Sequence, residues 1–188
     1  MIGLKVSMKE LMKIVALDVD DVILDLVPNW LRYYNQDFSD NLTKDKITEW
    51  DISKFIKPSA KKAIYEYTEN EEIYETAEPV KDALRGVNLI KEYGYRTIYV
   101  TANNPYNSKF NWLIKNEFLD DKKDFVSAYD KSLILADYII DDKWENVADF
   151  KGVGFLFNQP WNEYSLYHNR VENWNDIINK IEEGVMFT

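Results

Sequence analysis

The clearest pattern in this chain is a short apolar run that ends abruptly in carboxylates. Residues 14–17 form the run, Ile-Val-Ala-Leu, and Asp18, Asp20 and Asp21 follow it. A short run of this kind with β-branched members is typical of a buried strand. Side chains alternate along an extended chain, so we expect Asp18 and Asp20 to project to the same side.

From residue 80 onward, segments with helical spacing alternate with short apolar segments. The pattern predicts helices over 80–93, 106–118, 146–150 and 174–183, and strands over 96–100, 125–127, 136–140 and 153–157. Strands that alternate with helices form right-handed crossovers and a parallel sheet that is covered on both faces. The sequence therefore predicts an α/β protein with a Rossmann-like parallel sheet.

Residues 28–79 differ from the rest because they lack strand alternation. Their pattern indicates helices over 30–38 and 59–69. Trp50 is the aromatic residue of this segment that we favour as facing a site. Most aromatic residues of a small segment are needed for its own core. We predict that 28–79 form a small helical cap inserted after the first strand, and that 1–27 and 80–188 form the core. Residues 1–12 are a weakly specified lead-in, and Met8 or Met12 could equally begin the folded part.

Composition limits the setting and the partners. The chain has 188 residues, no cysteine and a net charge of −10. It has no apolar run of membrane-spanning length, and residues 1–12 lack the features of a signal peptide. We therefore expect a cytoplasmic protein with no membrane partner. The negative charge argues against a nucleic-acid polymer as partner, although a local cluster of cations can still hold a small anion.

Several kinds of chemistry are excluded by the residues that are scarce. His168 is the single histidine, so a zinc site with several histidine ligands is excluded, and its polar surroundings favour an ordinary surface position. Gly152-Val-Gly154 lacks the remaining glycine of a dinucleotide fingerprint, and no P-loop pattern occurs. An EF-hand loop from Asp18 fails because Val22 stands where an oxygen ligand is needed.

Three predicted strands end in polar residues that parallel geometry would bring together. The first ends in Asp18 and Asp20, the second in Thr101, and the third in Asp141 and Asp142. Parallel strands end on the same edge of a sheet, where open α/β sheets bind ligands. Lys131 precedes the third strand and could reach the same place as a cation. Clustered carboxylates favour a hard cation such as Mg²⁺, so the set suits metal-assisted phosphoryl transfer.

These motifs resemble those of the haloacid-dehalogenase superfamily of phosphohydrolases, whose order is Asp-x-Asp, Thr or Ser, Lys, and Asp-Asp. Within it the chain is most similar to the 5′(3′)-deoxyribonucleotidases. Supporting features are the small insert, Lys109 in Lys-Phe-Asn-Trp, and the segment Phe-Asn-Gln-Pro-Trp-Asn at 157–162. Two residues depart from the family pattern, because Asp21 stands where Gly is frequent and Ala102 where Ser is common.

The resemblance implies a mechanism. Asp18 would attack phosphorus to form an aspartyl-phosphate, and Asp20 would protonate the leaving oxygen and then activate water. Mg²⁺ would be held by Asp18, by the backbone carbonyl of Asp20 and by the acidic pair. Of that pair, we expect Asp142 to be the direct ligand and Asp141 its orienting neighbour.

The remaining assignments concern the substrate, for which the resemblance implies a small-molecule nucleotide. Thr101 and the backbone N–H groups of Ala102 and Asn103 would hold the phosphoryl oxygens, and Lys131 would neutralise their charge. Lys109 is expected either to contact the phosphate or to lie on an exposed helix face. Trp50 could stack on the base. The sequence leaves open a homodimer, a different small phosphoester as substrate, and a non-catalytic interaction protein that keeps the fold.

Overall fold

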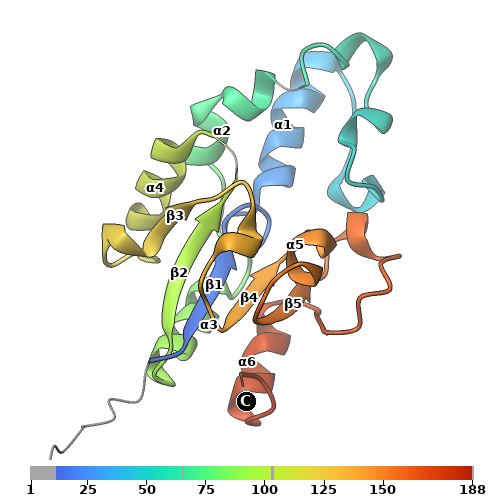
Figure 1. Cartoon of the computed structure of the whole chain (residues 1–188). Helices are drawn as coiled ribbons and strands as arrows, with labels where there is room; N and C mark the ends of the chain where they lie inside the picture. The colour runs from blue at the N-terminus through green and yellow to red at the C-terminus, as the bar shows by residue number, and fades with distance from the viewer. Residues whose placement is uncertain (1–11, 65, 103, 188) are drawn as a thin grey trace, which may run out of the picture.

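The computed structural model describes residues 12–64, 66–102 and 104–187, so Met8 and the expected start at that residue lie outside the described residues. Its centre is a six-stranded sheet in the order β3-β2-β1-β4-β5-β6, and all neighbouring strands run parallel (Figure 1). The strands are β1 (Ile14–Asp18), β2 (Arg96–Thr101), β3 (Phe125–Ser127), β4 (Tyr138–Asp141), β5 (Val153–Phe157) and β6 (Arg170–Val171). The predicted parallel α/β fold is confirmed.

The apolar run that opens the pattern forms the central strand of this sheet. Its residues alternate between two cores: Val15 and Leu17 belong to one cluster, and Ala16 to another. Buried side chains on both faces explain why the run is continuously apolar rather than alternating with polar residues. Because β1 lies between β2 and β4, the residues that follow it are flanked by the ends of both neighbours.

Helices cover both faces of the sheet, as predicted. One core includes residues of α3, α4 and α6, with Val87, Trp112 and Trp174 buried in it, and the other includes Val147 of α5. The bounds of these helices are Ala83–Glu92 for α3, Tyr106–Lys115 for α4, Trp144–Ala148 for α5 and Trp174–Glu182 for α6.

Between β1 and α3 the chain forms a helical segment with a core of its own, at the top of Figure 1. It consists of α1 (Leu26–Phe38), α2 (Glu71–Glu75) and four short 3₁₀ turns, η1 (Lys44–Lys46), η2 (Ile52–Lys54), η3 (Pro58–Ala60) and η4 (Glu66–Glu69). Its buried residues are Trp30, Leu31, Tyr34, Leu42, Ile47, Ile56, Ala60, Ile64, Ile73 and Tyr74. Tyr33, Phe38, Phe55 and Tyr67 are partly buried against the same core. The expectation that most aromatic residues of this segment fill its own core is confirmed.

One predicted helix in this segment is wrong. The helix expected over 59–69 is replaced by η3, by turns at 61–64 and by η4. Ala60 and Ile64 are fully buried in the small core. Packing such a core outweighs the weak helical preference of the residues between, because propensity is a small energy that tertiary contacts override.

Other element bounds differ by a few residues. Helix α1 begins at Leu26 instead of residue 30, with Pro28 in its first turn, where a proline is tolerated. Helix α4 ends at Lys115 instead of 118, because Glu117 has a left-handed φ of 63°. The strand pattern missed β6, which has only two residues, and the helix pattern missed α2.

Candidate active site

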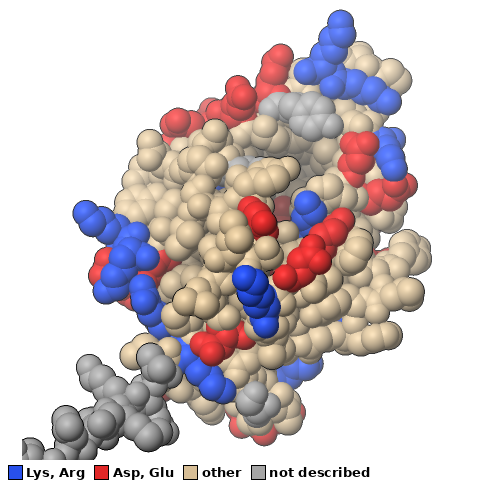
Figure 2. All heavy atoms as spheres, in the orientation of Figure 1, with Lys and Arg blue, Asp and Glu red and all other residues tan. Residues whose placement is uncertain are grey.

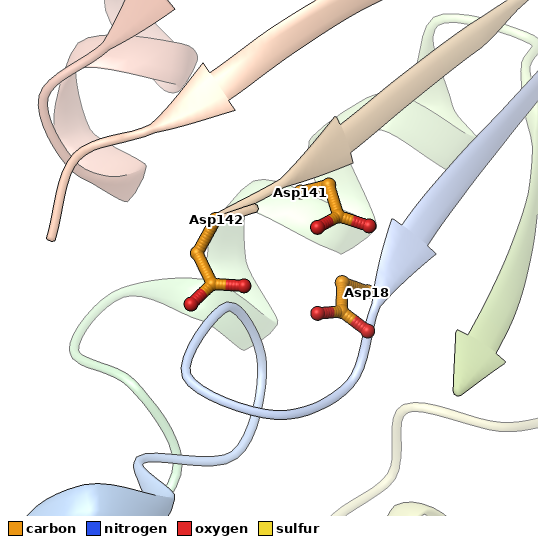
Figure 3. Close-up of side chains that lie close together, drawn as sticks. All are labelled: Asp18, Asp141 and Asp142. Atoms are coloured by element: carbon orange, nitrogen blue, oxygen red, sulfur yellow. The ribbon is translucent and has the colours of Figure 1, made fainter. Parts of the chain in front are cut away.

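Three buried carboxylates meet at the carboxyl end of the sheet (Figure 3). Asp18 is the last residue of β1, Asp141 is the last of β4, and Asp142 follows it. Each offers an oxygen that lies within 4.8 Å of those of the other two. The pairing of Leu17 with Ile140 in adjacent parallel strands brings Asp18 and Asp141 side by side. The expected convergence of the first and third motifs is therefore present.

Lys131 lies between two of these carboxylates. Its ammonium donates to Asp18 Oδ1 at 2.5 Å and to Asp141 Oδ2 at 2.7 Å, and its side chain is 2% exposed. The lysine begins the turn η6 (Lys131–Leu133), and Asp130 caps that turn by accepting from the Ser132 N–H. A short capped turn thus delivers the cation that the sequence expects at this edge.

The two adjacent aspartates have different surroundings. Both oxygens of Asp141 accept from protein donors, since Asn146 Nδ2 reaches both at 3.0 and 3.1 Å and Lys131 reaches Oδ2. Asp142 Oδ2 accepts from Trp161 Nε1 at 2.8 Å. The carboxylate oxygens of Asp141 therefore accept more hydrogen bonds than those of Asp142 and have fewer lone pairs left for a metal ion. This difference supports the expectation that Asp142 is the direct metal ligand.

The charge of this cluster favours a cation. Burial raises the pKa of Asp18 to about 7, against the opposing effect of the Lys131 ammonium. Burial and then the charge of Asp18 raise the pKa of Asp142 well above its usual range. Burial lowers the pKa of Lys131, but Asp141 and Asp18 outweigh it and raise that pKa. One lysine cannot compensate three carboxylates, and this all-oxygen donor set fits a hard divalent cation such as Mg²⁺.

The side chain of Asp20 lies outside this group of three. Its Oδ2 accepts from Lys109 Nζ at 2.6 Å, and Lys109 also donates to Thr101 Oγ1 at 2.9 Å. Thr101 ends β2 and is fully buried, and Lys109 lies in α4, the helix that follows this strand. The second motif thus joins the first through a lysine.

A pocket of about 420 Å³ opens over these groups. Its wall includes Asp18, Asp20, Ala102, Lys131 and Asp142 from the core. The helical segment contributes apolar and aromatic side chains, among them Leu26, Trp30, Ile47, Trp50, Ile64 and Tyr74. Trp50 is 57% exposed and packs edge-on against Trp161. Asn103 lies outside the described residues.

A second lysine joins the helical segment to the core. Lys44 of η1 donates to Asp21 Oδ1 at 2.9 Å and to Asp25 Oδ1 at 2.7 Å. Its ammonium also lies 5.4 Å from the centre of the Trp161 ring. Asp21 has a left-handed φ of 56°, which explains physically why glycine suits this position in the resembled family.

Sequence reasoning missed Asn146, Trp161 and Lys44, which hold Asp141, Asp142 and Asp21. A partial signal existed for Trp161, which lies in the segment 157–162 that carries part of the family resemblance. Asn146 lies at the fifth position after Asp141, in a helix whose orientation the sequence does not specify. Lys44 offered no signal, because a lysine in a polar stretch is usually solvated.

A family model described as "5′ nucleotidase, deoxy (Pyrimidine), cytosolic type C protein" matches residues 12–185. The chain belongs to this family. The predicted enzyme class is thereby confirmed, and the protein is a phosphoric monoester hydrolase of the 5′-nucleotidase type whose substrate is a small nucleotide.

Individual relatives agree with this family. The nucleotidase is 29% identical over 173 residues to the 5′(3′)-deoxyribonucleotidase of Bacillus subtilis, covering 90% of this chain and 98% of the relative. It is 26% identical over 164 residues to the 5′(3′)-deoxyribonucleotidase of Clostridium acetobutylicum, covering 84% of each.

A solved structure supports the fold. The haloacid dehalogenase-like family hydrolase of Streptococcus pneumoniae aligns with a TM-score of 0.60 at 8% identity, covering 90% of this nucleotidase and 98% of that chain. The predicted superfamily is confirmed by the family match, the relatives and this fold together. Within the described part of the nucleotidase, every helix is too short or too polar to span a bilayer.

Proposed function

We propose that this nucleotidase hydrolyses deoxyribonucleoside monophosphates through an aspartyl-phosphate on Asp18. The observation that carries the proposal is the position of Asp18, which lies in the pocket wall with its Oδ1 held 2.5 Å from the Lys131 ammonium. Relatives that bear the name 5′(3′)-deoxyribonucleotidase support the deoxyribonucleotide as substrate.

The chemistry proceeds in two displacements. In the first, an oxygen of Asp18 bonds to phosphorus while the bond from phosphorus to the nucleoside oxygen breaks, and Asp20 gives that oxygen a proton. In the second, Asp20 takes a proton from water, the water oxygen bonds to phosphorus, and the bond to Asp18 breaks. Phosphate and an unchanged enzyme result.

Asp18, Asp142 and the backbone carbonyl of Asp20 would hold a Mg²⁺ ion, and Asp141 would orient its neighbour Asp142. When bound, the ion supplies positive charge to the phosphoryl oxygens and keeps Asp18 ionised. The crowded carboxylates support this assignment because they otherwise repel one another in a buried setting.

The remaining contacts hold the substrate. Lys131 would neutralise phosphoryl charge, and the Thr101 hydroxyl with the N–H groups of Ala102 and Asn103 would bind phosphoryl oxygens. Trp50 would stack on the base at the pocket mouth, where its ring is partly exposed. Lys109 is fully buried, so the expected alternative of an exposed helix face is wrong, and its expected contact with the substrate is untested.

We further propose that residues 28–79 act as a cap that limits substrates to mononucleotides in the cytoplasm. Residues of this segment line the pocket over the strand ends, which supports exclusion of polymers. On the face shown in Figure 2, basic side chains are interspersed with acidic ones instead of forming a continuous basic surface. Such a surface offers little to a nucleic-acid backbone.

The test is turnover of a panel of phosphoesters by the purified protein, with Mg²⁺ and with EDTA. The panel contains deoxy- and ribonucleoside monophosphates, phosphorylated oligonucleotides and sugar phosphates. We expect the highest kcat/KM on a deoxyribonucleoside monophosphate, with loss of activity in EDTA and in Asp18→Asn. A sugar phosphate as best substrate would establish the alternative of another small phosphoester, and equal rates on oligonucleotides would contradict the cap.

A further inference from the structure

Lys109 is one of the most deeply buried charged side chains in the described part of the chain, with an exposed fraction of 0%. Burying an ammonium is costly unless anions or polar groups replace its lost water. The partners of Lys109 therefore reveal what the position requires. Three of these partners, Asp20, Thr101 and Tyr74, belong to the candidate active site or to its wall.

Lys109 joins three separate parts of the molecule. Its ammonium donates to Asp20 Oδ2 after β1 and to Thr101 Oγ1 at the end of β2. It also lies 5.1 Å from the centre of the Tyr74 ring in α2, a distance typical of a cation–π contact. The lysine thus fixes two groups of the proposed mechanism relative to each other.

The contact with Thr101 sets the direction of that hydroxyl. An ammonium has hydrogens to donate and no lone pair to accept with. Thr101 Oγ1 must accept from Lys109, so its own hydrogen is directed to a different acceptor. A phosphoryl oxygen is an acceptor with no hydrogen, and it is therefore the kind of partner for which this hydroxyl is prepared.

The contact with Asp20 sets the orientation of its carboxyl group. Oδ2 is held at 2.6 Å by Lys109, whereas Oδ1 is buried and has no hydrogen-bond partner within the described residues. Asp20 also lies in the pocket wall. With a single strong contact, the direction of this carboxyl depends on the lysine.

We propose that Lys109 is a positioning residue, which orients the Asp20 carboxyl and the Thr101 hydroxyl from behind and does not itself touch the phosphoryl group. The inference rests on the proposed function, because Asp20 and Thr101 take their roles from it. A direct phosphate contact would require the ammonium, which is fully buried and not part of the pocket wall, to move toward the pocket.

Lys109→Met separates these two roles, since it keeps the length of the side chain and removes the charge. Positioning through Asp20 matters most where the leaving group needs a proton, and general acid catalysis is worth roughly 10²–10⁴-fold. We expect the pre-steady-state burst rate to fall about 10²-fold with a deoxynucleotide. With p-nitrophenyl phosphate the fold loss in burst rate should be smaller by a factor of at least about ten. KM should change little. Equal losses on both substrates together with a raised KM would overturn the proposal and indicate a phosphate contact.

Two further variants sharpen the result. In an Asp20→Asn background, Lys109→Met should add little to the loss on the deoxynucleotide, because the group through which it acts is already absent. A full additional loss would contradict positioning through Asp20. Lys115→Met, an exposed lysine in the same helix, is the matched control and should leave both burst rates unchanged.

Rescue distinguishes positioning from a packing effect. The chain has no cysteine, so Lys109→Cys carries a single thiol. Alkylating it with 2-bromoethylamine in the unfolded state, then refolding, replaces the lysine with an ammonium of nearly equal reach. We expect the deoxynucleotide burst to recover at least tenfold over the unalkylated variant. Failure to recover, with wild type surviving the same treatment, would contradict the proposal.

One readout needs no turnover and separates failure of this inference from failure of the proposed function. The Tm changes of Lys109→Met and Asp20→Asn should be strongly non-additive, because the two side chains form one buried contact. Non-additive Tm changes in a protein with no phosphatase activity would contradict the proposed function while preserving the contact. Additive changes in an active enzyme would contradict the inference alone.

Discussion

Two lysines in this nucleotidase each bridge a pair of aspartates, in different regions of the molecule. Lys131 bridges Asp18 and Asp141 at the carboxyl end of the sheet, and its side chain is 2% exposed. Lys44 bridges Asp21 and Asp25 where the helical segment meets the core, and its side chain is 20% exposed.

The difference lies in the charge that each lysine leaves unbalanced. Around Lys131 a third carboxylate, Asp142, is buried within reach, so the site has an excess of negative charge. Lys44 also lies over the Trp161 ring, whose face attracts a cation. Three buried carboxylates around one lysine favour a metal ion. Lys44 has only two carboxylates around it, and that of Asp25 is 35% exposed to solvent, so this smaller excess suits a contact that holds two segments together.

Of the substitutions that test this difference between the two lysines, Lys131→Met should have the largest effect, which is a loss of kcat. Removing one preorganised donor to developing charge typically lowers kcat by about 10²–10³-fold. We expect such a loss in steady-state kcat, because the variant also leaves Asp18 and Asp141 facing each other without a cation. Lys44→Met is the matched control in the other region, and its kcat should stay within about fivefold of wild type. Similar losses in the two variants would mean that the regions do not differ in role.

Removal of metal should make the pH dependence of stability differ between the regions. Burial raises the pKa of Asp18 to about 7, so native protein without metal keeps a proton there that the unfolded chain releases near the ordinary value of 3.8. The native state binds more protons between these values, so the free energy of unfolding falls as pH rises from about 4 to about 7. We expect a lower Tm in EDTA at about pH 8 than at about pH 5.5.

Mg²⁺ should remove most of that difference. The ion binds ionised carboxylates, so it should raise Tm more at about pH 8, where Asp18 is charged, than at about pH 5.5. Asp21, whose pKa burial raises to about 6, contributes a smaller pH dependence that Mg²⁺ leaves in place. An equal Mg²⁺ effect on Tm at both pH values would contradict the assignment of the carboxylate cluster as the metal site.

A smaller effect is expected from the Lys44 region, and it concerns stability. Leaving a buried charged group without its partner costs about 1–3 kcal/mol. For a chain of this size that cost lowers Tm by roughly 2–12 °C in Lys44→Met. Asp21→Gly should restore part of the loss in the double variant, since glycine removes the unpaired carboxylate and suits the left-handed φ of 56°. If the double variant is less stable than Lys44→Met, the proposed bridge is not what holds this joint.

The smallest expected effect is that of Trp50→Ala, which removes the ring that the helical segment presents at the pocket mouth. Stacking on an aromatic side chain is worth about 1–3 kcal/mol for a base, and an exposed ring should lie at the lower end. We expect KM for a deoxynucleotide to rise about fivefold, with kcat unchanged. The KM for p-nitrophenyl phosphate, which has no base, is the control and should change less. An unchanged KM for the nucleotide would place the base elsewhere.

The sequence predicted the core of the fold better than the helical segment. Strands such as Ile14–Asp18 and Val153–Phe157 are buried on both faces, so their continuous apolar character identifies them. The segment around Pro58–Ala60 has no such periodicity, because its turns are determined by contacts within a small core. Such contacts join residues that are distant in the chain, and a local pattern does not contain them.

The same distinction applies to the site. Asp18, Thr101 and Asp141 end parallel strands, so topology alone brings them to one edge. The partners that orient them come from loops and helix starts, where Trp161 and Asn146 depend on the path of the chain. The burial of Lys109 also depends on which face α4 turns toward the sheet, which spacing within the helix leaves undetermined.

The central claim, an aspartyl-phosphate on Asp18, is tested most directly by trapping the intermediate. Enzyme that is turning over a radiolabelled deoxyribonucleoside monophosphate is quenched in acid within milliseconds, and the labelled peptide is identified by mass spectrometry. We predict a hydroxylamine-sensitive phosphoryl group on the peptide that contains Asp18, and its absence in Asp18→Asn. Full turnover with no labelled protein at any quench time, or a label on another residue, would contradict the claim.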